Sequence, residues 1–319
     1  MNLYEIIKRG EEAKKSKDPI TFYTRDVINS RNIKILMDPI DTLKSMSIKQ
    51  NEYNPYNQHL AQVFKEFSGK DEFNLDNNPT LNKKFIKQKE LDLYMHNIEE
   101  LITKAYINYY NNSKLPTRLY RSITKGELNF IKNNKRINTL WSTTKDFETC
   151  AGFTMEAAET EWDPIEHYIL QLSLNDRIPF IDVDKDSKTV YEPNEVILLR
   201  PFNVSNPLLI KSGGMDEYGF YSLKTIPICD ATIKSITNNC EYIEFEEVIK
   251  LYDSIKQEFD KYSKVIEQIL NYEIDHSIFN DTNYKEWANK LITMINMLQN
   301  HINYCILKDK DPKKLIKSL

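Results

Sequence analysis

Apolar residues follow a helical period at the two ends of the chain. Between residues 91 and 109 they recur at steps of three and four, which places them on one face of a helix. The same spacing predicts helices over residues 244–273 and 284–307. Residues 1–115 as a whole are expected to be helical, with a polar break over residues 71–79 and Thr80 available as the cap of the next helix. We interpret the apolar face of the helix over residues 91–109 as a core-packing surface.

Between residues 117 and 237 the pattern changes to short strand-like segments. Only one helix is expected here, starting near Asp146. Crowded short strands with few helices between them favour mixed or antiparallel sheets over a doubly wound parallel sheet, so the predicted fold class is α+β. The strands are expected over residues 118–123, 139–144, 168–174, 178–183, 196–199 (with residue 204 as the outer limit), 223–228 and 231–236.

The chain is therefore expected to have three parts. Residues 1–79 form an N-terminal helical region, residues 80–237 form the strand-rich core, and residues 238–319 form a C-terminal helical region. A length of 319 residues suits about two domains.

Composition narrows the class of protein. The 43 basic residues nearly balance the 47 acidic ones, which disfavours a dedicated nucleic-acid binder. No segment approaches the run of about 20 apolar residues that a membrane span needs. The first ten residues are charged and periodic, which is not typical of a secretory signal. The four cysteines are scattered, so we expect an intracellular, reducing environment.

Metal and phosphate motifs are missing from the sequence. The five histidines are dispersed, without the spacing of a zinc site. Neither a GxGxxG nor a GxxxxGK loop occurs, so a nucleotide would be held by another device.

Candidate chemistry begins where a polar turn meets a buried strand. Glu192 and Glu195 precede the apolar run over residues 196–199, and Pro193 and Pro201 limit that run to strand length. A carboxylate at the mouth of a rigid strand can act on a ligand in a neighbouring cleft. The alternative is a solvent-facing glutamate on an edge strand.

Two further polar sites stand in other strand segments. Arg121 lies in Leu-Tyr-Arg-Ser, and Ser142, Thr143 and Thr144 follow Trp141. Taken singly, each has an ordinary explanation: Arg121 could pair with a carboxylate at a strand end, and Ser142 could hydrogen-bond a turn.

Taken in order, the three sites resemble the mono-ADP-ribosyltransferases of the arginine–serine–glutamate type, a family that includes bacterial toxins, secreted effectors and phage enzymes. The matching pieces are Leu-Tyr-Arg-Ser at residues 119–122, Trp-Ser-Thr-Thr-Lys-Asp at 141–146 with Ala-Gly-Phe at 151–153, and Glu-Pro-Asn-Glu-Val-Ile-Leu at 192–198. The resemblance covers residues 80–235. It implies an NAD-binding catalytic core of two packed mixed β-sheets, with NAD as cosubstrate and no metal.

The resemblance also assigns roles that suit NAD cleavage. Breaking the bond between nicotinamide and ribose builds positive charge on the sugar, and Glu195 would stabilise that charge. Arg121 would bind the pyrophosphate, because a guanidinium can grip two oxygens. Ser142 would orient Glu195.

Four other residues complete the implied site. The backbone of Ser122 would approach the nicotinamide amide, while Thr143 and Thr144 would hold the local geometry of their strand. Phe153 would stack on nicotinamide, with a place in the core as the alternative.

The acceptor side departs from the family pattern. Relatives carry Glu or Gln two residues before the catalytic glutamate, where this chain has Pro193. Glu192 stands three residues before Glu195, and on a strand only a bend would bring it to the same face. Three nearby acids are alternatives for the acceptor side, and we interpret them as a solvated acidic turn; these are Asp182, Asp184 and Asp186. The acceptor residue is therefore not predicted.

The resemblance predicts transfer of ADP-ribose from NAD to a macromolecule, most simply a host or bacterial protein. The alternatives are NAD hydrolysis with water as acceptor, and a non-catalytic binding module of transferase-like fold. Expected partners are the target protein and an activator or immunity protein, with a nucleic-acid acceptor less favoured. An effector that acts in a host cytoplasm and a phage protein in a bacterial cytoplasm both fit this sequence.

Overall fold

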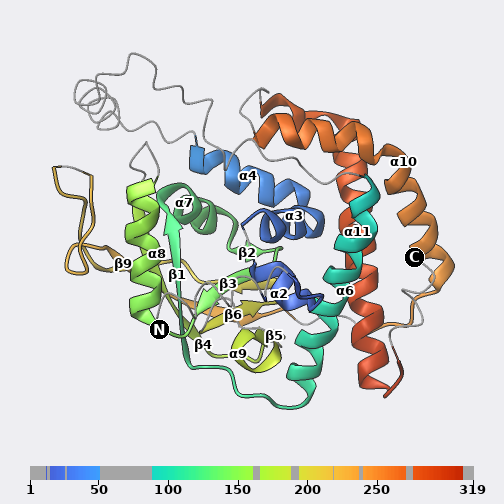
Figure 1. Cartoon of the computed structure of the whole chain (residues 1–319), viewed down its shortest axis with the longest axis horizontal. Coiled ribbons are helices and arrows are strands. Elements are labelled where there is room, and N and C mark those ends of the chain that lie inside the picture. Colours follow the sequence, from blue (N-terminus) through green and yellow to red (C-terminus); the bar gives the residue numbers. More distant parts are fainter. Residues whose placement is uncertain are drawn as a thin grey trace.

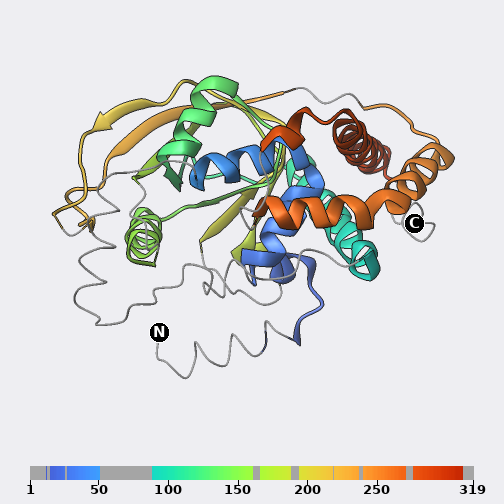
Figure 2. The same ribbon diagram turned by 90° about the horizontal axis from the view of Figure 1, so that it is seen from above.

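A computed structural model describes residues 12, 15–25, 27–50, 88–160, 166–187, 194–217, 219–236, 240–270 and 276–311. A mixed β-sheet lies at the centre, and most of the helices gather on one side of it (Figures 1 and 2). The structure confirms the α+β class. Within these ranges no helix combines the length and the apolar character that a membrane crossing requires.

The helices confirm the periodic segments of the sequence. The predictions over residues 91–109, 244–273 and 284–307 correspond to α6 (Gln88–Tyr110), α10 (Phe245–Leu270) and α11 (Thr282–Leu307). The N-terminal segment forms α2 (Pro19–Thr24), α3 (Val27–Met37) and α4 (Pro39–Gln50), and a 3₁₀ turn spans His276–Asn280. The predicted break over residues 71–79 and the helix start at Thr80 lie outside the described residues.

The strand-rich part contains more helix than expected. The helix near Asp146 is α8 (Phe147–Thr160), and the Asp146 carboxylate accepts a hydrogen bond from the backbone N–H of Thr149. The expectation of a single helix was wrong, because α7 (Lys125–Asn134) and the short α9 (Val183–Asp186) also occur. The Thr124 hydroxyl accepts from the N–H of Glu127 and so caps α7, a local signal present in the sequence.

Nine strands form one hydrogen-bonded sheet in the described ranges, in the order β2-β7-β9-β4-β1-β3-β6-β5, with β8 on β9. The β4–β9 pair is parallel and the other pairs are antiparallel. The strands are β1 (Arg118–Thr124), β2 (Arg136–Ile137), β3 (Trp141–Thr144), β4 (His167–Leu174), β5 (Phe180–Asp182), β6 (Glu195–Leu198), β7 (Phe202–Val204), β8 (Leu208–Lys211) and β9 (Ile228–Ser235).

Several strand predictions need correction. The run after residue 195 does not continue to residue 204, because β6 ends at Leu198 and β7 begins at Phe202. Residues 223–227 form a turn and a loop, in which the N–H of Thr225 bonds the carbonyl of Ser222. The short strands β2 and β8 were not predicted.

The resemblance implied two packed sheets. The structure instead has one continuous sheet, and the two halves of this sheet pack on each other. Four strand spacings separate β7 from β3 along this path, which in a flat sheet would be about 19 Å. The rings of Trp141 in β3 and Phe202 in β7 nevertheless lie with centroids 5.6 Å apart. The sheet therefore curls around an apolar core, and β1 and β3 share only the register pair Tyr120–Thr144 at its narrowest join.

A second core binds the helices of both chain ends to the sheet. Apolar residues of α2, α3, α4, α6, α10 and α11 form one cluster with Ile181 of β5 and Ile197 of β6. The apolar face of α6 lies in this cluster, as interpreted from its spacing. The division of the chain at residues 79 and 237 stays a prediction, since both boundaries lie outside the described residues.

Candidate active site

Adjacent strands carry the three predicted residues. Thr144 of β3 pairs with Glu195 of β6, and Ser142 pairs with Ile197. Because side chains two apart on a strand share a face, Ser142 and Glu195 lie on the same face, as diagonal neighbours with Cα atoms about 7–8 Å apart. Both side chains are half-buried. This face continues into the helical core through Ile197.

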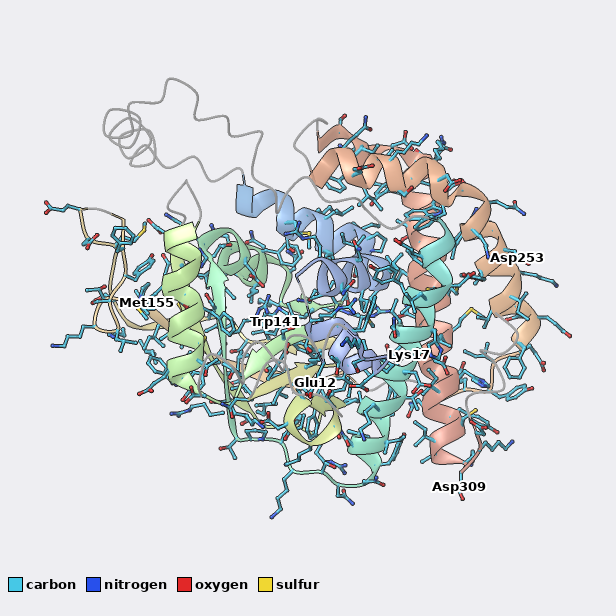
Figure 3. All side chains as sticks on the ribbon, in the orientation of Figure 1. Glu12, Lys17, Trp141, Met155, Asp253 and Asp309 are labelled. Carbon is cyan, nitrogen blue, oxygen red and sulfur yellow. The ribbon has the colours of Figure 1, made fainter. Side chains whose placement is uncertain are left out.

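Arg121 reaches the site from the edge of β1. By alternation its side chain lies on the face of Trp141, and its guanidinium carbon is 5.1 Å from the centroid of the Trp141 ring (Trp141 is labelled in Figure 3). Where β1 and β3 separate, Nη1 donates to the Ser142 carbonyl oxygen at 2.7 Å. Nε and Nη2 both donate to Oε1 of Glu127, at 3.2 and 2.8 Å. Three of the five N–H groups are thus used, and two remain.

The Arg121–Glu127 pair is largely buried. The two side chains are 15% and 7% exposed. Glu127 is in the first turn of α7, so the cap that starts this helix also aims its carboxylate at β1. The pair fixes the direction of the guanidinium.

Tyr23 brings the N-terminal segment into the site. Its side chain is 1% exposed, and its hydroxyl lies 3.0 Å from Oγ of Ser142. Burial and then the negative charge of Glu195 raise the pKa of Tyr23 well above its ordinary value, although hydrogen bonds with Ser142 and Ser30 lower it in part. The phenol is therefore neutral at physiological pH, and the Glu195 carboxylate is close enough to influence it.

The Asp18 carboxylate both caps α2 and ties it to Ser187. Asp18 caps α2 by accepting from the N–H of Thr21, and Oδ2 of the same carboxylate accepts from the Ser187 hydroxyl at 2.7 Å. The α2 ribbon lies across the strands in Figure 1. Tyr23 is consequently carried on a helix that is tied to the end of α9.

The opposite side of the face is bordered by α8. Ser122 of β1 accepts a hydrogen bond from the Thr154 hydroxyl of α8 at 2.9 Å, and Tyr120 meets Phe147 edge-to-face at 5.5 Å. Phe153 on the same helix is 47% exposed. The alternative that Phe153 packs in the core was therefore wrong, and its ring is accessible to a ligand.

The two threonines after Ser142 bind protein atoms. The Thr143 hydroxyl donates to the Val196 carbonyl at 2.7 Å, on the face opposite Ser142. The Thr144 hydroxyl accepts from the N–H of Asp146. Thr143 thus connects β3 to β6, and Thr144 connects β3 to the start of α8. The Thr143 side chain does not lie on the face of Ser142 and Glu195.

A charged network holds the turn before Glu195. Lys145 donates from Nζ to Asp182 at 2.8 Å and to Asp184 at 2.7 Å. Asp184 also accepts from the N–H of Asn194, whose carbonyl accepts from the N–H of Lys145. Burial alone would lower the pKa of Lys145, but the two carboxylates raise it above its ordinary value. Asn194 has a positive φ of 67° and directly precedes Glu195.

The interpretation of the three nearby acids as a solvated turn was wrong for Asp182 and Asp186, whereas Asp184 is exposed. Asp182 is buried, and Asp186 accepts from Asn108 and from the N–H of Asp182. These carboxylates are used to fold α9 and the turn. Glu192 and Pro193 lie outside the described residues, so the acceptor-side candidate has no structural description.

Sequence reasoning missed Tyr23, Glu127, Trp141 and Lys145. For Glu127 a signal existed, the Thr-x-x-Glu cap at residues 124–127. Trp141 and Lys145 adjoin the Ser-Thr-Thr motif, but no local rule gives them partners. Nothing in the sequence links Tyr23 to a residue 119 positions away.

Two cavities lie away from the candidate site. A cavity of about 350 Å³ lies between the end of α6 and the loop before β5, and one of about 220 Å³ adjoins α4 and α11. Neither is lined by Arg121, Ser142 or Glu195. The described residues contain no group of three or more His, Cys, Asp or Glu side chains suited to a metal ion.

Comparisons with known proteins add little to this geometry. No protein-family model matches the chain, and no curated protein matches it. Among solved structures, the ADP-ribosyltransferase Vis in complex with agmatine is similar at a TM-score of 0.25 and 11% identity, over 61% of this chain and 94% of that chain. Similarity this weak carries no argument about the fold or the activity of this chain. The functional assignment therefore depends on this chain's own residues.

Proposed function

We propose that this chain cleaves NAD and transfers the ADP-ribose to a macromolecule, with a protein side chain of a host or bacterial target as acceptor. The observation that carries the proposal is the placement of Ser142 and Glu195 on one face of neighbouring strands, with the Arg121 guanidinium on the Ser142 carbonyl. This face lies between α2 and α8 (Figure 1). Tyr23 of α2 contacts Ser142, and Phe153 is an exposed residue of α8.

The carboxylate of Glu195 suits the bond that must break. The C–N bond between ribose and nicotinamide takes its electron pair to the ring nitrogen, so nicotinamide leaves neutral and needs no general acid. The ribose gains oxocarbenium character, and a fixed carboxylate stabilises this positive charge. The same carboxylate can hold the ribose in place by accepting a hydrogen bond from one of its hydroxyls. The acceptor then bonds to the ribose carbon and loses a proton.

Arg121 is suited to the pyrophosphate. Its two remaining N–H groups, one on each Nη atom, are available for phosphate oxygens. The ion pair with Glu127 fixes the orientation of the guanidinium, and the carboxylate partly neutralises its positive charge. Arg121 therefore acts as a directional donor more than as an isolated positive charge.

The face between α2 and α8 offers a place for nicotinamide. Phe153 is exposed and can stack on a flat ring. Ser122 has the small side chain that lets a backbone approach the amide, and its hydroxyl is held by Thr154. We assign Ser122 and Phe153 to this end of NAD.

NAD hydrolysis remains the second candidate reaction. In relatives a Glu or Gln stands two residues before the catalytic glutamate, and here that position is Pro193. Proline has no polar side chain to orient a protein acceptor, so water can take the acceptor's place. A non-catalytic binding module is the third candidate, and it would leave NAD intact.

The test is incubation with NAD labelled on its adenylate half, with and without a cell lysate. We expect a labelled protein band that is absent in Glu195→Gln and unchanged in Glu246→Gln, a matched variant of an exposed glutamate on α10. Free ADP-ribose without a band would establish hydrolysis, and a labelled nucleic-acid fraction would replace the protein acceptor. Intact NAD with wild type, with and without lysate, would contradict the proposed function.

A Glu192→Gln variant separates the two halves of the reaction. If Glu192 serves the acceptor, this variant keeps NAD cleavage and loses the labelled band. If this variant instead loses NAD cleavage, the assignment of Glu195 to cleavage and Glu192 to the acceptor is wrong.

A further inference from the structure

Arg200 is a buried cation at the far end of the strand that carries Glu195. It follows β6 by two positions and is 3% exposed. Its backbone carbonyl accepts from Nε2 of Gln299 in α11 at 2.8 Å, which fixes the main chain. Five residues of extended chain span about 16 Å, so this site is separate from the candidate active site.

The guanidinium of Arg200 is short of acceptors. Nε and Nη2 are buried and form no hydrogen bond with the described residues, and no ion pair joins the side chain to a described carboxylate. Burial lowers the pKa of Arg200 to about 10, so the group is still protonated at neutral pH. The negative charge of Asp38 opposes this lowering, but Asp38 forms no ion pair with Arg200. Buried guanidinium N–H groups that lack acceptors are destabilising.

A cavity of about 220 Å³ adjoins this side chain. It lies between the start of α4, the β2 region and α11, and its polar lining comes from Asp38, Asp41, Arg136, Asn138, Arg200 and Asn296. The volume is below the about 300–1,000 Å³ typical of pockets for drug-sized molecules. The cavity is therefore suited to a small ion or molecule and is too small for NAD.

The acidic residues of the lining already have donors. Asp38 accepts from the N–H of Asp41 at 3.0 Å, and Asp41 accepts from Nδ2 of Asn138 at 3.1 Å. Asn138 in turn accepts from Nε of Arg136 at 2.9 Å. Nε and Nη2 of Arg200 donate to neither of these acids, although the charge of Asp38 acts on the guanidinium. The exposed Arg136 keeps N–H groups for a second contact.

We infer that this cavity binds a small oxyanion, a carboxylate or a phosphate, between Arg200 and Arg136. Guanidinium groups bind planar or tetrahedral oxyanions through paired N–H···O bonds, which a halide cannot reproduce. The ligand would join α4 and α11 to the end of β6. This inference stands whether or not the proposed reaction is correct.

Calorimetric titration and thermal unfolding of the full chain test the inference, with acetate and inorganic phosphate as separate probes in chloride buffer. We expect saturable binding of at least one probe and a melting temperature that rises and then levels off, as binding to the folded state requires. The probe that binds identifies the source of the oxyanion.

Three variants locate the site. Arg200→Met and Arg136→Gln should each weaken binding at least tenfold, while Arg118→Gln, which removes an exposed arginine on β1, should leave it unchanged. Arg136 is exposed, so its variant keeps the test decisive if Arg200→Met fails to fold. A melting temperature that rises linearly with either salt in all variants reflects general salt exclusion and overturns the inference, as does the absence of heat with both probes.

Discussion

The hydroxyl of Tyr23 lies 3.0 Å from the hydroxyl of Ser142, although 119 residues separate them in the sequence. A helix of the N-terminal segment thus supports the serine that the proposed mechanism uses to orient Glu195. The contact makes α2 part of the candidate site.

Tyr23→Phe should therefore slow NAD cleavage without unfolding the protein. The loss of one hydrogen bond is worth about 1 kcal/mol, which corresponds to an approximately fivefold lower kcat. The KM for NAD should change little, because Tyr23 acts through Ser142. Steady-state kinetics with a thermal melt as control measure both, and a higher kcat in the variant would show instead that α2 obstructs the site.

Removal of one partner of the Arg121–Glu127 pair should cost about 3 kcal/mol of unfolding free energy, because the other charge is left largely buried. We expect this loss in Arg121→Met and in Glu127→Leu. The double variant should lose less than the sum of the two, since it leaves no orphan charge. Urea unfolding of the four proteins gives the coupling; simple additivity would mean that the pair contributes no interaction.

Asn194 should tolerate glycine better than alanine. Its φ of 67° is left-handed, where alanine costs about 1–2 kcal/mol and glycine carries no such penalty. Asn194→Ala should lower both the melting temperature and kcat, because the strained turn leads directly into Glu195. Equal melting temperatures for the two variants would contradict the backbone argument.

Asp38 should make the folded state less stable as pH rises. Burial, and then the charge of Asp41, raises its pKa from 3.8 to about 6. The folded state then binds the proton more tightly than the unfolded state, so the penalty is absent below the unfolded pKa and is complete above pH 6.

Asp38→Asn removes this titration and keeps a capping side chain for α4. Between about pH 4.5 and about pH 7.5, the variant should gain about 2 kcal/mol relative to wild type. Unfolding in chloride buffer at the two pH values measures the difference. A constant difference would show that Asp38 titrates normally.

The long helices could be predicted because their signal is local. In α6, α10 and α11 the apolar side chains repeat at the helical period over many turns, and that period alone specifies which face is buried. The strands β1, β3, β4 and β6 were predicted as short strand-like segments, and β6 also as an apolar run. The short strands β2 and β8 were not predicted, because their pairing depends on the neighbouring strand and not on a local pattern.

The sequence by itself determined the α+β class, the main helices and the order of Arg121, Ser142 and Glu195. Only the tertiary structure decided that Ser142 and Glu195 share a face, that Glu127 holds Arg121, and that Tyr23 reaches Ser142. It also decided that Asp182 is buried and that Arg200 borders a cavity. The physical reason is that burial and pairing depend on which surfaces meet when helices dock on a curved sheet, and a local pattern specifies the surfaces without specifying their partners.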